Sequence, residues 1–130
     1  MFKREVFLKE KLAGCQPTDL RIYYSGGIVS AHMSKDNRRF SHGAVTSLMP
    51  EYEIEVGEKE TVVVLKGTLK VRFLHKNAPA DEPRFDERWT KVHTGETVVF
   101  EAGTGVILAC DQEEPVEFWC EYGDAPTNSE

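Results

Sequence analysis

The chain has 130 residues, of which 40% are hydrophobic, and it carries a formal net charge of −6 at pH 7. This length favours a single domain with a packed core, and the hydrophobic content argues against a disordered chain. The negative charge disfavours nucleic acid and an anionic membrane surface as main partners, because both would repel the protein.

Residues 2–13 have the pattern of a short amphipathic helix, with apolar side chains recurring among Lys and Glu. These side chains are Phe2, Val6, Phe7, Leu8, Leu12 and Ala13. Gly14 is suited to end the helix, and the Gln-Pro-Thr-Asp run at 16–19 is typical of a linker or turn. The segment lacks the apolar stretch of a signal peptide. We therefore expect residues 1–20 to form an N-terminal extension, helical or irregular.

From residue 21 onward the pattern changes to short runs rich in Val, Ile, Thr and aromatic residues, bounded by Gly, Pro, Asn and Asp. The predicted strands span 21–24, 27–33, 43–49, 52–56, 61–66, 68–74, 89–93, 97–100, 106–110 and 116–122. A turn is expected around Gly67 between two of them. So many short strands predict an all-β fold, a jelly roll or a closely related barrel, over residues 21–123.

Two segments outside the predicted strands look irregular. The polar run 75–88 contains two prolines and is predicted to be an exposed loop, either a solvated insertion or a lid or dimer contact over the barrel mouth. Residues 124–130 are expected to form a flexible tail.

Three cysteines, Cys15, Cys110 and Cys120, stand at wide spacing, without the pattern of a zinc site. An odd number of separated cysteines favours reduced thiols. No segment approaches the about 20 apolar residues of a membrane span. We therefore expect a cytoplasmic protein without membrane contact.

The spacing of acids and glycines matches the first of two motifs found in metal-binding cupins, G-x5-H-x-H-x3–4-E-x6-G. Glu60 is followed by six residues and then Gly67, while Glu53 and Glu55 occupy the places of the two histidines. Three acids could gather a hard cation, or Glu53 and Glu55 could face solvent and leave Glu60 alone in the barrel. A buried Glu60 without metal would have a raised pKa, which suits general acid–base work or hydroxyl recognition.

The second cupin motif, G-x5-P-x-G-x2-H-x3-N, is matched in its glycines and not in its ligand. Five residues separate Gly95 from Glu101 and Gly103 takes the later glycine position, but Val106 stands where the histidine belongs. Val cannot bind a metal, so we predict a cupin-type jelly-roll barrel without a metal site or another cofactor.

Five motifs in order resemble a family of small single-domain cupins, the pyrimidine/purine nucleoside phosphorylases, over about residues 22–122. They are the Tyr-Ser-Gly-Gly turn at 24–27, Pro-Glu-Tyr-Glu-Ile at 50–54, Glu60 with the Thr-Val-Val-Val-Leu-Lys-Gly-Thr-Leu run at 61–69, Trp89 separated by five residues from Gly95, and the closing Pro-Val-Glu-Phe-Trp-Cys-Glu-Tyr at 115–122. The extension at 1–20, the loop at 75–88 and Glu101 depart from the family pattern.

The resemblance implies metal-independent phosphorolysis, in which a purine or pyrimidine nucleoside and phosphate give a free base and a pentose 1-phosphate. In that reaction Glu60 is the candidate catalytic residue, able to accept hydrogen bonds from the ribose hydroxyls. Phosphate needs cationic donors, and an aromatic ring can stack on the base. The candidate substrate-binding residues are Arg39, Lys66 and Arg72 for phosphate, Tyr52, Phe73 and Trp89 for the base, and Glu53. Alternation after Leu69 also allows Arg72 to point outward.

Two other functions fit the sequence. One is a non-catalytic cupin module that binds a nucleoside, a sugar or another small metabolite, and the other is a metal-dependent cupin enzyme that uses the acidic cluster. The missing His-x-His pair argues against the metal-dependent enzyme. The family likeness also predicts a homodimer, because such barrels pair their exposed sheet edges.

Overall fold

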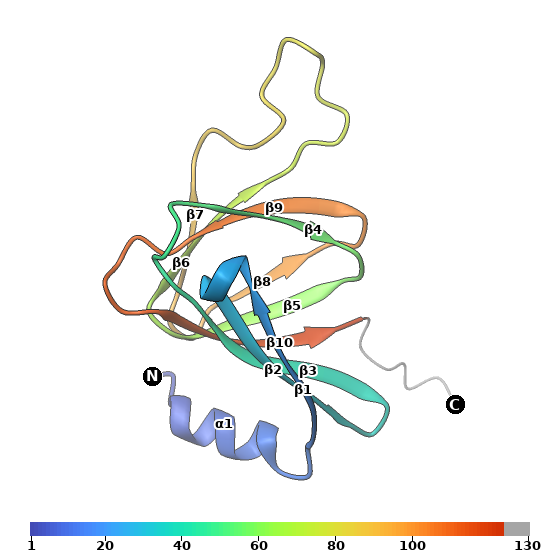
Figure 1. Cartoon of the computed structure of the whole chain (residues 1–130), viewed down its shortest axis with the longest axis vertical. Helices are drawn as coiled ribbons and strands as arrows, with labels where there is room; N and C mark the ends of the chain where they lie inside the picture. The colour runs from blue at the N-terminus through green and yellow to red at the C-terminus, as the bar shows by residue number, and fades with distance from the viewer. Residues whose placement is uncertain (124–130) are drawn as a thin grey trace.

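The computed structural model describes residues 1–123, which form one helix, one 3-10 turn and ten strands (Figure 1). The elements are α1 (Arg4–Leu12), β1 (Gln16–Tyr23), η1 (Tyr24–Gly26), β2 (Ile28–Lys35), β3 (Arg38–Val45), β4 (Tyr52–Val56), β5 (Glu60–Lys66), β6 (Thr68–Phe73), β7 (Thr90–His93), β8 (Thr97–Phe100), β9 (Thr104–Ala109) and β10 (Val116–Tyr122). The predicted flexible tail at 124–130 lies outside the described residues.

The strands form two antiparallel sheets, which confirms the prediction of a mostly β protein. One sheet has the order β1-β2-β3-β10-β5-β8 and the other has the order β4-β9-β6-β7. The inner faces of both sheets share one apolar core, because side chains alternate between the two faces of each strand. On β10, for example, Val116 and Cys120 point into the core, whereas Trp119 points to the outer face of the six-stranded sheet.

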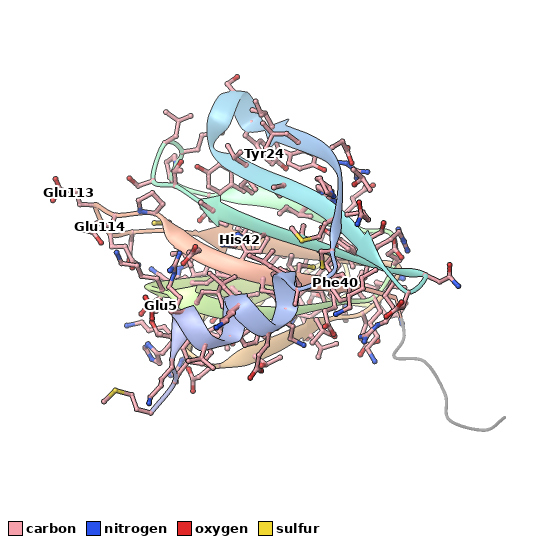
Figure 2. The ribbon with its side chains drawn as sticks, turned by 90° about the horizontal axis from the view of Figure 1, so that it is seen from below. Glu5, Tyr24, Phe40, His42, Glu113 and Glu114 are labelled. Carbon is pink, nitrogen blue, oxygen red and sulfur yellow. The ribbon has the colours of Figure 1, made fainter. Side chains whose placement is uncertain are left out.

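The helix α1 covers part of that outer face, as Figure 2 shows near Phe40. Leu8 is buried there, and Phe7 meets the edge of the Trp119 ring at a centroid distance of 6.2 Å. The guanidinium of Arg4 donates to the Glu117 carboxylate from Nε and, at 2.7 Å, from Nη2. These contacts hold the helix on the sheet.

The predicted helix at 2–13 is confirmed, although its apolar face is narrower than expected. Val6 and Leu12 are 51% and 41% exposed, because α1 rests on the sheet through Phe7 and Leu8. No helix in the described part of the chain has the length and apolar character needed to cross a membrane.

Two predicted strand boundaries are wrong. Residues 16–19 begin β1 instead of forming a linker, and β1 lies at a sheet edge where Pro17 costs no ladder hydrogen bond. The third strand spans Arg38–Val45 instead of 43–49, because Asp36 and Asn37 form a two-residue turn with φ of 52° and 62°. Positive φ at both central residues is the geometry that tight β-hairpins require, and Asp and Asn tolerate it.

The segment 75–88 projects beyond β6 and β7 as an exposed loop, as predicted (Figure 1). It continues the β6–β7 hairpin through a bridge between Leu74 and Phe85 and an ion pair between His75 and Asp86.

Candidate functional site

A cavity of about 580 Å³ lies between the two sheets. Its walls are mainly apolar, and nine polar or charged side chains also line it. The apolar lining residues are Ile28, Val45, Ile54, Val62, Leu69, Phe100, Leu108 and Phe118. The volume lies in the usual range of about 300–1,000 Å³ for ligand pockets.

Glu60 is the most buried carboxylate that lines this cavity. It begins β5, where Val62 and Val64 occupy the next two inward positions and are buried in the core. Burial raises the pKa of Glu60, a hydrogen bond from the Cys120 thiol 3.6 Å away opposes this rise, and the charge of Glu58 adds to it. A raised pKa confirms the expectation for a desolvated Glu60, which therefore holds its proton to higher pH than an exposed glutamate.

Hydroxyl groups and a histidine lie beside Glu60 on the six-stranded sheet. The Tyr122 hydroxyl is 2.8 Å from Ser41 Oγ, and its ring stacks on His32 with a centroid separation of 5.6 Å. Burial raises the pKa of Tyr122 and lowers that of His32, so both groups are neutral near pH 7. Because Tyr122 and Ser30 line the cavity, this side offers neutral hydrogen-bonding groups to a ligand.

Two arginines lie at the cavity, each paired with a carboxylate. Arg21 lines it and binds Asp19 through Nε at 2.8 Å. Arg39 forms a bidentate pair with Glu58 and lies over the Tyr122 ring, and both of these partners line the cavity.

The turn that follows β1 brings Tyr24 to the cavity through a costly backbone conformation. Tyr24 and Ser25 have φ of 52° and 56°, in the left-handed region that most L-residues avoid. The Tyr24 hydroxyl donates to the backbone carbonyl of Glu53, and its ring lies against Tyr52 at 5.2 Å. Such strain costs about 1–3 kcal/mol per residue and concentrates at functional sites.

Replacing Ser25 by Gly is expected to raise the free energy of unfolding by about 0.5–1 kcal/mol, because Gly adopts positive φ without a steric penalty. Urea unfolding measures the change. The matched control is Ser34→Gly on the extended strand β2, which should lower stability by a similar amount. A destabilised Ser25→Gly variant would show that this turn is not strained.

The sequence-predicted residues fall into two groups. Glu60 and Glu53 line the cavity, and Arg39 adjoins two residues that do. Tyr52 lies next to it, fully buried, and its hydroxyl donates to the Thr46 carbonyl at 2.8 Å. Glu53 also borders the cavity. Its side chain nevertheless points to the face of β4 opposite to Tyr52, because neighbouring residues of a strand alternate between the two faces.

The other candidates do not line the cavity. Lys66 forms an ion pair with Glu114 at 3.5 Å, and Phe73 packs edge-on against Phe100. Trp89 lies against Lys70 and Arg72, whose charged ends are 4.8 and 4.5 Å from its ring centroid. Arg72 thus points outward, as alternation after Leu69 had allowed.

The acidic residues of the first cupin-like motif do not converge. Glu53 and Glu55 alternate with Ile54, which packs on the core, so their carboxylates point away from Glu60. Among residues 1–123, no group of three His, Cys, Asp or Glu side chains could hold a metal ion.

Sequence reasoning missed several cavity residues, namely Arg21, Tyr24, Ser30, Glu58, Phe118 and Tyr122. The alternation of Phe118, Cys120 and Tyr122 along one strand could have assigned them to one face. Arg21 carries no such signal, because all of β1 is exposed.

No family model matches the sequence, and no curated protein matches it. Solved structures with a similar fold exist. A protein of unknown function from Vibrio parahaemolyticus is 22% identical, with a TM-score of 0.63 over 82% of this chain and 97% of that chain. A DUF1255 protein of unknown function from Acinetobacter sp. ADP1 is 12% identical, with a TM-score of 0.63 over 84% and 94%. CENP-C of Drosophila melanogaster, in a structure bound to CAL1, is 12% identical, with a TM-score of 0.63 over 93% and 100%. These likenesses concern the fold alone.

Proposed function

We propose that this protein is a metal-independent nucleoside phosphorylase with a cupin-type jelly-roll fold. The observation that carries the proposal is the buried carboxyl of Glu60 inside a mainly apolar cavity of about 580 Å³, with Arg21 and Arg39 close by. The separated, unpaired cysteines are consistent with a cytoplasmic enzyme.

The reaction breaks the bond between C1′ of the pentose and a nitrogen of the base, and it forms a bond from C1′ to a phosphate oxygen. The departing base needs a proton. Glu60, whose raised pKa favours the protonated form, donates that proton to the base. Monohydrogen phosphate returns its own proton to the Glu60 carboxylate as it attacks C1′, so the enzyme ends in its starting state. Once ionised, the carboxylate also stabilises the positive charge that develops on the sugar.

Phosphate binding is assigned to Arg21 and Arg39. Guanidinium groups bind phosphate oxygens in pairs, and these two are the arginines nearest the cavity. Lys66 and Arg72 are not assigned to phosphate binding, because each forms an ion pair on another surface of the protein.

The base is assigned to the aromatic side chains of the cavity, Tyr24 and Phe118. They take the place of Tyr52, Phe73 and Trp89, which do not line it. The neutral hydroxyl of Tyr122 supplies a hydrogen bond to the sugar or the base, because its raised pKa keeps it protonated.

The second candidate function is a non-catalytic module that binds a small neutral metabolite. It is favoured by the pairing of Arg21 with Asp19 and of Arg39 with Glu58, because phosphate must compete with these carboxylates for both arginines. A neutral ligand would bind without disturbing either pair.

The test is the release of free base from uridine, cytidine, thymidine, adenosine, guanosine and inosine, with and without phosphate, in the presence of EDTA. The proposal requires release that depends on phosphate and survives EDTA. Isothermal titration calorimetry with the same nucleosides in the absence of phosphate measures their binding and tests the non-catalytic function. Binding without base release would establish the module, whereas base release without phosphate would indicate a hydrolase and contradict phosphorolysis.

A further inference from the structure

The strand β2 brings a serine and a histidine together at the cavity. Ser30 and His32 are two residues apart on this strand, so their side chains share its inner face. The Ser30 hydroxyl lies 2.9 Å from Nε2 of His32, and the two residues are 4% and 8% exposed. Ser30 lines the cavity, so a ligand bound there can contact it. A hydroxyl that is hydrogen-bonded to an imidazole is the arrangement that activates a serine nucleophile.

The strand β1, which lies beside β2 in Figure 1, places two charged side chains against this pair. Asp19 is opposite His32 and Arg21 is opposite Ser30 in the register of the two strands, and opposite residues share a face. Arg21 also lines the cavity. An acid beside the histidine favours its protonated form, and a cation beside the serine stabilises negative charge that develops on a bound carbonyl oxygen.

His32 is in the protonation state that a general base needs. Burial lowers the pKa of His32 below its ordinary value of 6.5, Arg21 lowers it further, and Asp19 opposes the change. The third titratable neighbour is Tyr122 of β10, whose neutral ring stacks on the imidazole. His32 is therefore uncharged at pH 7. An uncharged imidazole that carries its proton on Nδ1 can accept the serine proton at Nε2.

The wall beside Ser30 suits an uncharged acyl group. Gly43 lies opposite Ser30 on β3, and a Cβ at this glycine would be 2.9 Å from both Ser30 Cα and Phe118 Cζ. The absence of a side chain at Gly43 thus allows the Phe118 ring to lie close to Ser30. Ile28 and Val45 line the same cavity. Apolar side chains around a nucleophile favour the hydrocarbon part of a small substrate.

We propose that the cavity carries a further activity, independent of phosphorolysis: the hydrolysis of small neutral carboxylic esters, with Ser30 as the nucleophile. Ser30 Oγ attacks the carbonyl carbon while its proton passes to Nε2 of His32. Arg21 stabilises the negative charge on the carbonyl oxygen. His32 then gives the proton to the departing alcohol oxygen, and the acyl group stays on Ser30.

Water completes the reaction by the same route. It gives a proton to Nε2 of His32 as its oxygen attacks the acyl carbon, and the proton then returns to Ser30 Oγ as the carboxylic acid leaves. One ester and one water thus give one acid and one alcohol. Asp19 is a positioning residue, which acts on the reaction through its charge beside His32.

Acylation by p-nitrophenyl acetate tests the proposal, with mass spectrometry of the digested protein to locate the acetyl group. The wild type should release a stoichiometric burst of p-nitrophenolate and carry the acetyl group on Ser30. Ser30→Ala should abolish both signals. His32→Gln keeps a polar side chain but removes the base, so it should slow acylation by about 10²–10⁴-fold. Ser34→Ala is the matched control, because Ser34 lies on the same face of β2, and it should react like the wild type.

The pH profile separates a catalytic His32 from a structural one. Acylation of the wild type should rise in one step below pH 6.5, where His32 loses its proton, and stay level at neutral pH. Asp19→Asn should move this step to lower pH, because it removes the charge that raises the pKa of His32. A step that does not move would remove Asp19 from the mechanism.

Two results would overturn the proposal. One is an acetyl group found on lysines and never on Ser30, and the other is acylation of Ser30 at the wild-type rate in folded His32→Gln. Circular dichroism checks the fold of each variant, and the pH profile of the wild type decides the role of His32 if His32→Gln does not fold. The base-release assay involves no ester, so ester hydrolysis and phosphorolysis can fail independently.

Discussion

Replacement of Glu60 by Gln is expected to lower kcat/KM for phosphorolysis by about 10²–10⁴-fold, because the amide cannot donate a proton to the departing base. Glu113→Gln is the matched control. It removes the same charge from an exposed turn before β10, and Figure 2 places it at the edge of the molecule. Equal turnover of Glu60→Gln and wild type would remove Glu60 from the mechanism.

The same substitution should also change how stability depends on pH. The folded state raises the pKa of Glu60 above its ordinary value of 4.5, so folding favours the protonated form. Its contribution to stability is therefore complete below about pH 4.5 and is lost as the pH rises through the folded-state pKa. Gln is neutral at every pH and escapes this loss. Thermal unfolding from pH 4 to pH 8 should show Glu60→Gln becoming progressively more stable than wild type, and a constant difference would contradict the burial of this carboxyl.

Trp119→Ala is expected to cost about 3–5 kcal/mol in the free energy of unfolding, the range observed for large aromatic residues removed from a core. Trp119 is 1% exposed and lies between Phe40, at a centroid distance of 5.4 Å, and Phe7 of α1. Its removal leaves a cavity beneath the helix. Urea unfolding followed by circular dichroism measures the loss.

Trp119→Phe separates packing from hydrogen bonding at this position. The indole Nε1 is buried and has no hydrogen-bond partner among the described residues. Phe removes that unsatisfied donor and keeps most of the ring contacts, so its cost should stay near 1 kcal/mol. If both variants lost the same stability, the packing of α1 on Trp119 would not be the source of the effect.

Much of the fold could be predicted from the sequence, because most strands have one apolar face. The run 61–66 and the segment 116–122 alternate between core and outer face, and both form strands within one residue of the predicted limits. The boundaries near β1 and β3 were missed for a local reason. Turn-forming residues such as Pro17 also occur at a sheet edge, and the Asp36–Asn37 turn resembles an ordinary polar loop in the sequence.

The site was less predictable, because alternation separates the two faces of a strand without saying which one meets a cavity. Glu60 was found through its spacing to Gly67 in the cupin-like motif. Arg72 and Trp89 were equally plausible ligands by residue type, but they meet each other on the outer face of the four-stranded sheet. Only the packing of one sheet on the other decides which polar side chains reach the cavity.

The position of β10 has a consequence for how the protein is made. Among the described residues this strand follows the other nine, yet it lies between β3 and β5 in the middle of the six-stranded sheet. During synthesis, β1, β2 and β3 can pair with one another as a meander. The strands β5 and β8 join this sheet only through β10, so they cannot do so until residues 116–122 leave the ribosome. The six-stranded sheet is therefore completed only after residues 116–122 have been synthesised, through contacts distant in sequence, which make folding slow. Until then Val62, Val64 and their neighbours are exposed, and exposed apolar side chains in an incomplete sheet favour aggregation.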